Sequence, residues 1–157
     1  MLTHEDYLNE AFKEAFRGIR NDLGGPFGAV VVKDGVILGK GCNRVISDND
    51  PTAHAEVTAI REACRNVESY DLTGAVIYST CEPCPMCLSA IYWAKIKMVY
   101  FSLTQFDAHD IGFSDNLIYQ EFELEAEERT VKMEKIELPA AVELFEEWRK
   151  SPNKILY

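Results

Sequence analysis

The residues with the clearest capacity for chemistry lie in two short segments, HAE at positions 54–56 and PCPMC at positions 83–87. Imidazole and thiolate groups are ligands that zinc prefers, and three protein ligands leave the fourth tetrahedral position open to water. We therefore expect His54, Cys84 and Cys87 to form a site for one Zn²⁺ per subunit. Glu56 is not placed by its spacing from His54, because residues two apart do not share a helix face.

Each member of this set also has a simpler interpretation. A lone histidine on an apolar face is usually a hydrogen-bonded core residue, and an isolated C-x-x-C is often a redox pair or two buried thiols. Cys81 forms an overlapping C-x-x-C with Cys84, but we expect it at a strand end and interpret it as structural. A structural zinc module that included Cys81 as fourth ligand would be closed to water chemistry. A thiol redox module would leave the upstream H-x-E without a purpose, and Cys42 and Cys64 have the character of small core residues.

Two helix N-termini are expected to carry the ligands. A helix capped by Thr52 would bury positions 57, 60, 64 and 67 on one face, with His54 on the same stripe in its first turn. Residues 75–80 are a β-rich apolar run, and a helix is expected to begin near Pro83 or Pro85 because proline suits a first helical position. The free N–H groups and dipole at that terminus favour thiolates.

The remaining patterns describe the elements around the site. They predict helices at 5–19 and 140–150 and strands at 27–32, 36–41 and 96–102, with a possible further strand at 130–138. The Asp34-Gly35 dipeptide favours a tight hairpin turn between the first two strands. Residues 103–128 give no clear assignment. Strands that alternate with helices after a hairpin predict an α/β fold, with a mixed sheet covered by helices on both faces.

The composition excludes several classes of function. The 157 residues, 47% hydrophobic and 27% charged, predict one soluble domain spanning residues 1–157. No apolar run approaches the ~20 residues that cross a bilayer, and the N-terminus has no secretory pattern. Five cysteines, three of them within 81–87, favour metal binding in a reducing cytoplasm over a disulfide framework. A net charge of -10 disfavours nucleic-acid and membrane partners, which require clustered Lys and Arg.

Two longer segments carry a family resemblance. Residues 49–61 (NDPTAHAEVTAIR) and 81–94 (CEPCPMCLSAIYWA) resemble the cytidine deaminase superfamily, and within it bacterial guanine deaminases most of all. The H-x-E and P-C-x-x-C pair is the signature of zinc-dependent nucleobase deaminases. The likeness extends to residues 24–29 (GGPFGA), Asn43, residues 112–115 (GFSD) and the terminal Tyr157.

The resemblance implies a three-layer α/β/α fold with a mixed five-stranded sheet, and a homodimer in which the C-terminal segment, about 139–157, is exchanged between subunits. It implies hydrolysis of a free purine base, guanine to xanthine and ammonia, with Glu56 as proton shuttle. It also implies a substrate pocket to which five residues contribute, with Asp115 counted among the catalytic residues: Phe27, Asn43, the Ala55 backbone, Asp115 and Tyr157.

Alternatives remain at this level. A tRNA adenosine deaminase shares the zinc motif, but such enzymes usually have a basic surface and this chain is acidic. Guanosine, cytosine and an aminated triazine also stay open as substrates, because a nucleoside differs from its base only at the mouth of the pocket. Four of the pocket residues also have structural interpretations: Asn43 as a strand-end turn residue, Phe27 as a core aromatic, Asp115 as a helix cap and Tyr157 as a frayed terminus.

Overall fold

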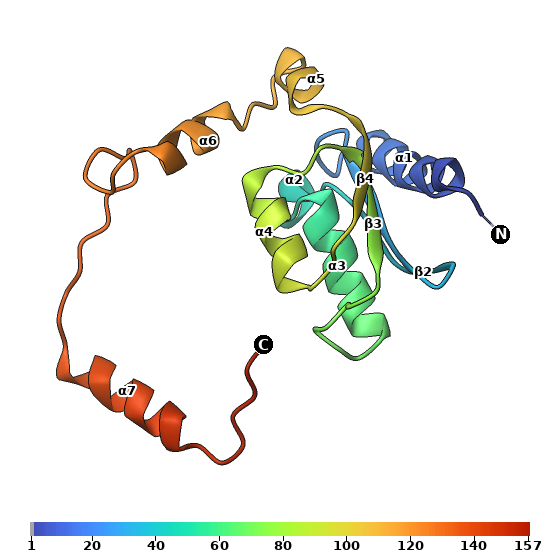
Figure 1. Ribbon diagram of the computed structural model, residues 1–157. Helices are drawn as coiled ribbons and strands as arrows, with labels where there is room; N and C mark the ends of the chain where they lie inside the picture. The colour runs from blue at the N-terminus through green and yellow to red at the C-terminus, as the bar shows by residue number, and fades with distance from the viewer. Residues whose placement is uncertain (1) are drawn as a thin grey trace. The chain divides into compact units, whose positions relative to one another are not determined.

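The computed structural model describes residues 2–157, which fall into two compact units, one ending at Asn116 and one comprising Leu117–Tyr157. The elements follow in chain order, and Figure 1 labels them: α1 (His4–Arg20), β1 (Gly28–Lys33), β2 (Val36–Cys42), α2 (Val45–Asp48), α3 (Ala55–Asn66), β3 (Val76–Cys81), α4 (Pro85–Trp93), β4 (Val99–Leu103), α5 (Gln105–Asp110), α6 (Asn116–Glu123) and α7 (Pro139–Lys150). The predicted helices and the first four predicted strands are therefore confirmed, with boundaries that differ by at most three residues. The short helices α2, α5 and α6 were not predicted.

The sheet has the strand order β2-β1-β3-β4. β1 is antiparallel to both of its neighbours, and β3 is parallel to β4, so the predicted mixed sheet is confirmed. The expectation of five strands is wrong for this chain, because residues 130–138 form no strand. A strand needs a neighbour for its backbone hydrogen bonds, and residues 117–157 contain no other strand that could supply them.

A tight turn joins β1 to β2. Asp34 and Gly35 adopt φ angles of +50° and +80°, which are the left-handed values that a two-residue hairpin loop requires. The turn fixes the register, so that Gly28 at the start of β1 lies opposite Cys42 at the end of β2. Residues 27 and 43, which flank these two ends, are thereby brought to the same edge of the sheet.

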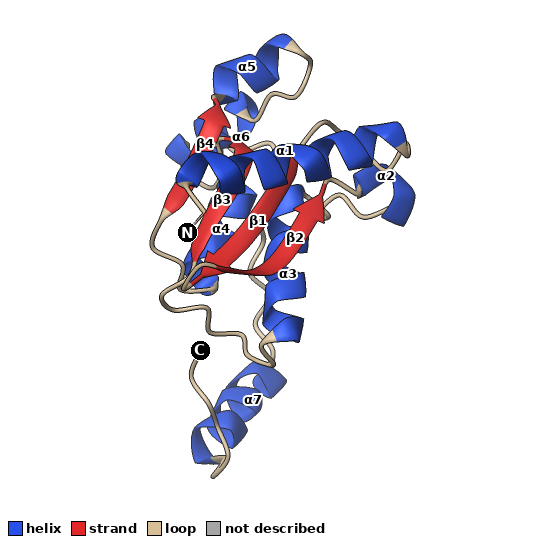
Figure 2. Ribbon diagram, turned by 90° about the vertical axis from the view of Figure 1, so that its right-hand side faces the viewer, coloured by secondary structure: helices blue, strands red, loops and turns tan. Residues whose placement is uncertain are grey.

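Helices cover both faces of the sheet, and each face has its own core. On one face, Tyr7 and Ala11 of α1 pack against Val30, Val32 and Tyr78. On the other face, α3 and α4 pack over β1 and β3, and Figure 2 shows α1 and α3 on opposite sides of the strands. Apolar residues that alternate along each strand feed both cores, as expected for a three-layer arrangement.

A glycine in β2 lets α3 approach the sheet closely. A Cβ atom on Gly41 would lie 2.4 Å from the Ala55 carbonyl oxygen and 2.6 Å from the Ala59 nitrogen, so no larger residue fits there without a shift of the backbone. The first turn of α3 therefore rests directly on β2. This contact positions the segment that carries His54 and Glu56.

The second unit, Leu117–Tyr157, is organised by local contacts. The Glu121 carboxylate accepts hydrogen bonds from the Thr130 backbone N–H at 2.6 Å and from its hydroxyl at 2.7 Å. The Arg129 Nε donates to the carbonyl oxygens of Glu121 and Leu124. None of residues 117–157 is buried. Across the described residues of both units, no helix is long and apolar enough to cross a membrane.

Candidate active site

The N-termini of α3 and α4 carry the three predicted ligands. His54 and Cys84 are the N-cap residues of these helices, and both have extended backbone angles. Pro85 occupies the first turn of α4, as its fixed φ angle favours, and Cys87 follows within the same turn. Thr52 does not cap α3, contrary to expectation, because its hydroxyl and N–H both donate to the Asp50 carboxylate and the helix begins later.

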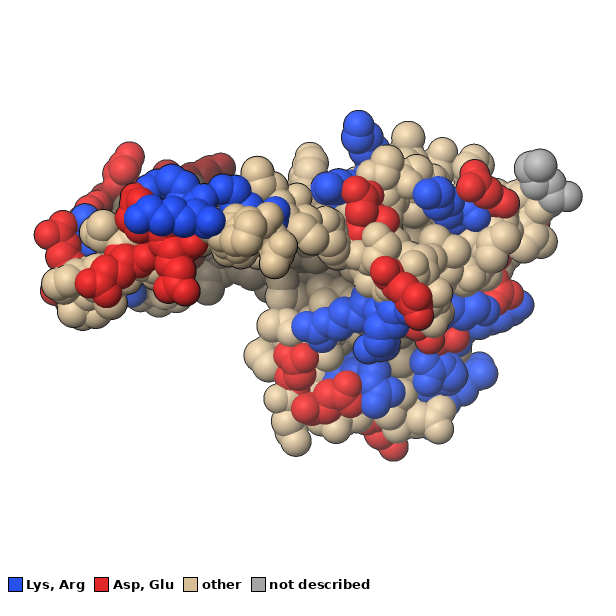
Figure 3. Space-filling model, turned by 90° about the horizontal axis from the view of Figure 1, so that it is seen from below, with Lys and Arg blue, Asp and Glu red and all other residues tan. Residues whose placement is uncertain are grey.

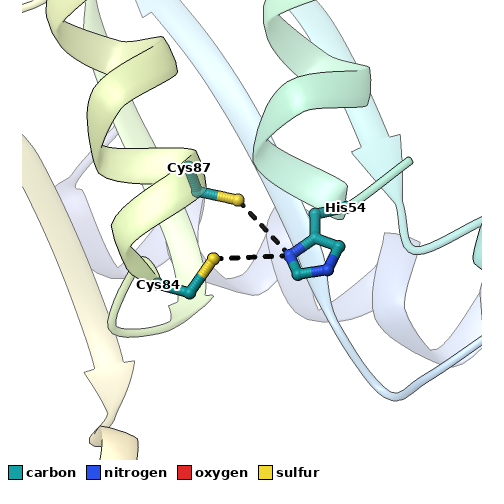
Figure 4. Close-up of side chains that lie close together, drawn as sticks. All are labelled: His54, Cys84 and Cys87. Atoms are coloured by element: carbon teal, nitrogen blue, oxygen red, sulfur yellow. Dashed lines mark hydrogen bonds between the residues drawn. The ribbon is translucent and has the colours of Figure 1, made fainter. Parts of the chain in front are cut away.

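The three ligand atoms converge (Figure 4). His54 Nδ1 lies 3.6 Å from Cys84 Sγ and 3.5 Å from Cys87 Sγ, and all three atoms lie within 4.8 Å of one another. Zinc bonds of ~2.3 Å to sulfur and ~2.0 Å to nitrogen at tetrahedral angles place N and S about 3.5 Å apart. The residues therefore fit a tetrahedral zinc ion held through Nδ1 and two Sγ atoms. In the part of the chain that the structure describes, this is the only such group of His, Cys and acidic residues.

The electrostatics of the cluster favour a thiolate even without metal. The Cys87 thiol donates a hydrogen bond that, with a further contribution from His54, lowers the pKa of Cys84 to about 4 despite its burial. The pKa of Cys87 is raised, first because it is the donor in that pair and then by burial. The neighbouring Cys84 raises the pKa of His54 in turn. A cation that replaces the shared proton would stabilise both thiolates, which is the chemistry of a metal site.

Glu56 lies beside the cluster and is 6% exposed. Its Oε1 accepts a hydrogen bond of 3.2 Å from the Ser79 hydroxyl, and its Oε2 lies 3.3 Å from Cys87 Sγ. Burial raises the pKa of this carboxyl group. A carboxyl group that takes up and returns protons near neutral pH requires such a raised pKa. Sequence reasoning missed Ser79, although a serine inside the apolar run of β3 was a signal.

Asn43 lies at the end of β2 and is 5% exposed. Its Oδ1 accepts hydrogen bonds from the backbone N–H groups of Gly25 at 3.2 Å and Val45 at 3.1 Å. These two donors identify the oxygen end of the amide. The NH₂ group is thus the end that remains to donate to another molecule. Through these bonds Asn43 also stabilises the backbone after β2, as expected for a turn residue at a strand end. This structural role leaves the NH₂ group available for the expected role in the pocket.

Aromatic rings and a carboxyl group form a second part of the expected pocket. The rings of Phe27 and Phe113 meet edge to face with centroids 5.1 Å apart. Asp115 is partly buried, and burial, then the charges of Cys84 and Glu82, raise the pKa of its carboxyl group. Phe113 lies in the segment 112–115 that carries the family resemblance, but the resemblance gave it no role in the pocket.

The remaining predicted residues have simpler placements. Ala55 is fully buried at the first turn of α3, and its carbonyl oxygen faces Gly41 of β2. Cys81 is not part of the ligand cluster, and its Sγ donates to the Thr104 carbonyl oxygen at 3.4 Å. Tyr157 belongs to the second unit, so its role in the pocket stays an expectation.

Comparisons with known proteins show the family of the chain. Residues 1–103 match the family model of the cytidine and deoxycytidylate deaminase zinc-binding region. The guanine deaminase of Bacillus subtilis (strain 168) is 47% identical over 156 residues, which are 99% of this chain and 100% of that protein. The crystal structure of the Bacillus subtilis guanine deaminase covers 99% of both chains with a TM-score of 0.95. The tRNA-specific adenosine deaminase of Aquifex aeolicus is 44% identical over 98 residues, 62% of this chain and 64% of that protein.

The fold and the His-Cys-Cys cluster thus define a zinc-dependent deaminase domain. The chain belongs to the cytidine and deoxycytidylate deaminase zinc-binding family.

Proposed function

We propose that the protein hydrolyses guanine to xanthine and ammonia. The observation that carries the proposal is the match to a guanine deaminase along the whole chain, at 47% identity with 99% and 100% coverage. The likeness to the Aquifex aeolicus tRNA-specific adenosine deaminase covers only 62% of the chain. Similarity that continues through the C-terminal third supports a shared substrate as well as a shared metal site.

His54 Nδ1, Cys84 Sγ and Cys87 Sγ would hold one zinc ion, and three protein ligands are typical of a catalytic zinc site. When bound, zinc would supply Lewis-acid chemistry that activates water near neutral pH. Glu56 then acts as the proton shuttle: Oε2 faces the cluster and can take a proton from water. The same carboxyl group delivers that proton to a ring nitrogen and later helps to protonate the departing amine.

The pocket residues complement guanine. The free NH₂ group of Asn43 donates, and guanine offers acceptors at O6 and N7, whereas adenine presents a donor at position 6. The edge-to-face pair of Phe27 and Phe113 supplies an apolar wall for a planar base. We propose that Asp115, with its raised pKa, assists proton transfer, that the Ala55 backbone contacts the base, and that Tyr157 closes the pocket.

The charge of the chain supports a small substrate over a polynucleotide. The net charge is -10, and in Figure 3 the acidic and basic side chains of the described residues are interspersed on the face shown. RNA binding depends on clustered cations that neutralise phosphates. This charge disfavours a tRNA substrate and supports a free base. We also propose that the protein acts in the cytoplasm.

We further propose that the protein is a homodimer in which the segment 139–157 is exchanged between subunits. Helix α7 presents Val142, Phe145 and Trp148 with exposed fractions of 68%, 68% and 48%, although an apolar helical stripe normally faces a core. Helix α4 is apolar on all sides, and its Tyr92 and Trp93 are 74% and 67% exposed. Apolar surfaces of this kind favour burial against a second copy.

The test measures zinc content and ammonia release from the purified full-length chain with guanine, adenine, cytosine, guanosine and an adenosine-containing tRNA anticodon stem-loop. We expect about one zinc per chain and guanine as the fastest substrate, with RNA bound only in the non-specific range at physiological salt. Turnover of the stem-loop with guanine untouched would instead identify a tRNA deaminase. Zinc without turnover of any compound would favour a structural module.

A further inference from the structure

Ser79 is a buried polar side chain that is not one of the three expected metal ligands. It lies on β3 and is 1% exposed. In the sheet register it stands between Ala29 of β1 and Phe101 of β4, and Ile77, two residues earlier on the same face, belongs to the core under α3 and α4. A hydroxyl group at such a position is costly unless it is hydrogen-bonded.

The hydroxyl group of Ser79 distinguishes the two oxygens of Glu56. Ser79 Oγ donates to Oε1 at 3.2 Å, whereas Oε2 lies 3.3 Å from Cys87 Sγ. One oxygen is therefore held from the sheet side and the other faces the metal ligands. The terminal torsion of a glutamate is broad and has no strong preference of its own, so an external partner must set the orientation of the carboxyl group.

We propose that Ser79 is a positioning residue for the proposed deamination. It fixes the rotation of the Glu56 carboxyl group so that only Oε2 exchanges protons beside the His-Cys-Cys cluster. The inference rests on the proposed function, because it assigns the shuttle role to Glu56. Ser79 itself does not touch the substrate. It acts through Glu56, in the way that outer partners orient the groups that do the chemistry.

The first experiment compares Ser79→Ala with the wild type as full-length, zinc-loaded protein. We expect kcat for guanine to fall by ~10- to 100-fold, because a small misplacement of a reacting group has a large kinetic cost. KM is expected to stay within about threefold and zinc content to stay unchanged, since neither the pocket wall nor a ligand is altered. Tyr7→Phe is the matched control, because it removes a buried hydroxyl that donates to the Gly35 carbonyl oxygen at 3.0 Å on the other face of the sheet. It should lower the melting temperature and leave kcat unchanged.

A second pair of variants isolates the hydroxyl group from the volume of the side chain. Ser79→Thr and Ser79→Val add nearly the same bulk, but only threonine keeps the hydroxyl. We expect the threonine variant to turn over guanine at least about tenfold faster than the valine variant. This comparison also serves if Ser79→Ala folds poorly.

Three results would overturn the proposal: wild-type kcat in Ser79→Ala, equal kcat in the threonine and valine variants, or a loss of activity that follows a loss of zinc. Failure of the proposed function would give a different result, because the wild-type protein itself would then release no ammonia from guanine.

Discussion

The two units of the chain differ in where their apolar side chains are placed. The unit that ends at Asn116 buries two apolar layers, one on each face of its sheet. The His-Cys-Cys cluster lies at the N-termini of α3 and α4, which cover one of these layers. The unit Leu117–Tyr157 has no buried residue, yet it is rich in large apolar side chains. Those exposed by 60% or more are Leu117, Phe122, Val131, Met133, Ile136, Leu138, Val142, Leu144, Phe145, Ile155, Leu156 and Tyr157.

The difference shows which unit buries its apolar side chains within itself and which does not. Burial of apolar surface is the main favourable term in folding, and the first unit obtains it from its own residues. The second unit does not, so we infer that its apolar surface is buried in the proposed dimer.

The largest effect is expected from the metal ligands of the first unit. Cys84→Ser and Cys87→Ser should each reduce zinc from about one per chain to near zero and abolish guanine turnover, because two remaining ligands hold zinc poorly. Metal analysis and an ammonia assay on the same preparation measure both quantities. Cys64→Ala serves as control, since Cys64 lies on α3 outside the cluster. Zinc retained in either serine variant would contradict the ligand assignment.

The next effect concerns the shuttle. Glu56→Ala and Glu56→Gln should keep zinc and the fold while kcat falls by at least ~10²–10⁴-fold, the usual contribution of general acid–base catalysis. Metal content, a circular-dichroism spectrum and steady-state kinetics check the three parts. Near-normal turnover in either variant would remove Glu56 from the mechanism.

A smaller effect is expected from the end of the second unit. Deletion of Ile155, Leu156 and Tyr157 should leave zinc content and dimerisation intact, because the whole of α7 remains. Guanine turnover should fall by ~10- to 100-fold if these residues close the pocket and exclude water.

Mixing the truncated chain with the Glu56→Ala chain tests the proposed exchange. In an exchanged heterodimer, the truncated chain supplies an intact Glu56 and the other chain supplies the terminal residues, so one complete site forms and activity returns. Verified subunit mixing without any recovery would mean that the tail acts on its own chain or not at all.

The same division explains how much could be predicted from the sequence. The spacing of Cys84 and Cys87 and the proline at the start of α4 were strong local signals, and the structure brings both sulfur atoms together with His54 Nδ1 within 4.8 Å. The N-terminus of α3 had a weaker signal, because the expected cap at Thr52 was wrong. The contact between Ser79 and Glu56 was not predictable, since strand alternation gives the face of a residue but not its partner on the covering helix. Helix α5 was not predicted, although Thr104 and Asp107 form a capping box at its start. A helix of six residues is too short to show the repeat of apolar residues that identifies a helix.

The predicted strand at 130–138 failed for a physical reason of the same kind. Its alternation of apolar and polar residues, with Val131 and Met133 exposed by 73% and 68%, satisfies the pattern of a strand. A pattern does not say where the neighbouring strand comes from, and residues 117–157 contain none. Alternation of apolar and polar residues is therefore not sufficient to predict a strand when the same unit supplies no strand to pair with it.

The smallest effect is expected from Cys81→Ala, which separates burial from metal binding within the first unit. Cys81 is 5% exposed and donates to the Thr104 carbonyl oxygen, and burial, followed by the charge of Glu56, raises its pKa to about 11. It therefore stays a neutral thiol at pH 7, whereas the hydrogen bond from Cys87, followed by contributions from His54, lowers the pKa of Cys84. The alanine variant should keep zinc and turnover within about twofold and lose only ~1–2 kcal/mol of stability, the cost of one weak hydrogen bond and a small cavity. Zinc analysis and thermal unfolding measure these two quantities. If Cys81→Ala released zinc as readily as Cys84→Ser, four ligands would close the site. The first unit of the chain would then be a structural zinc module.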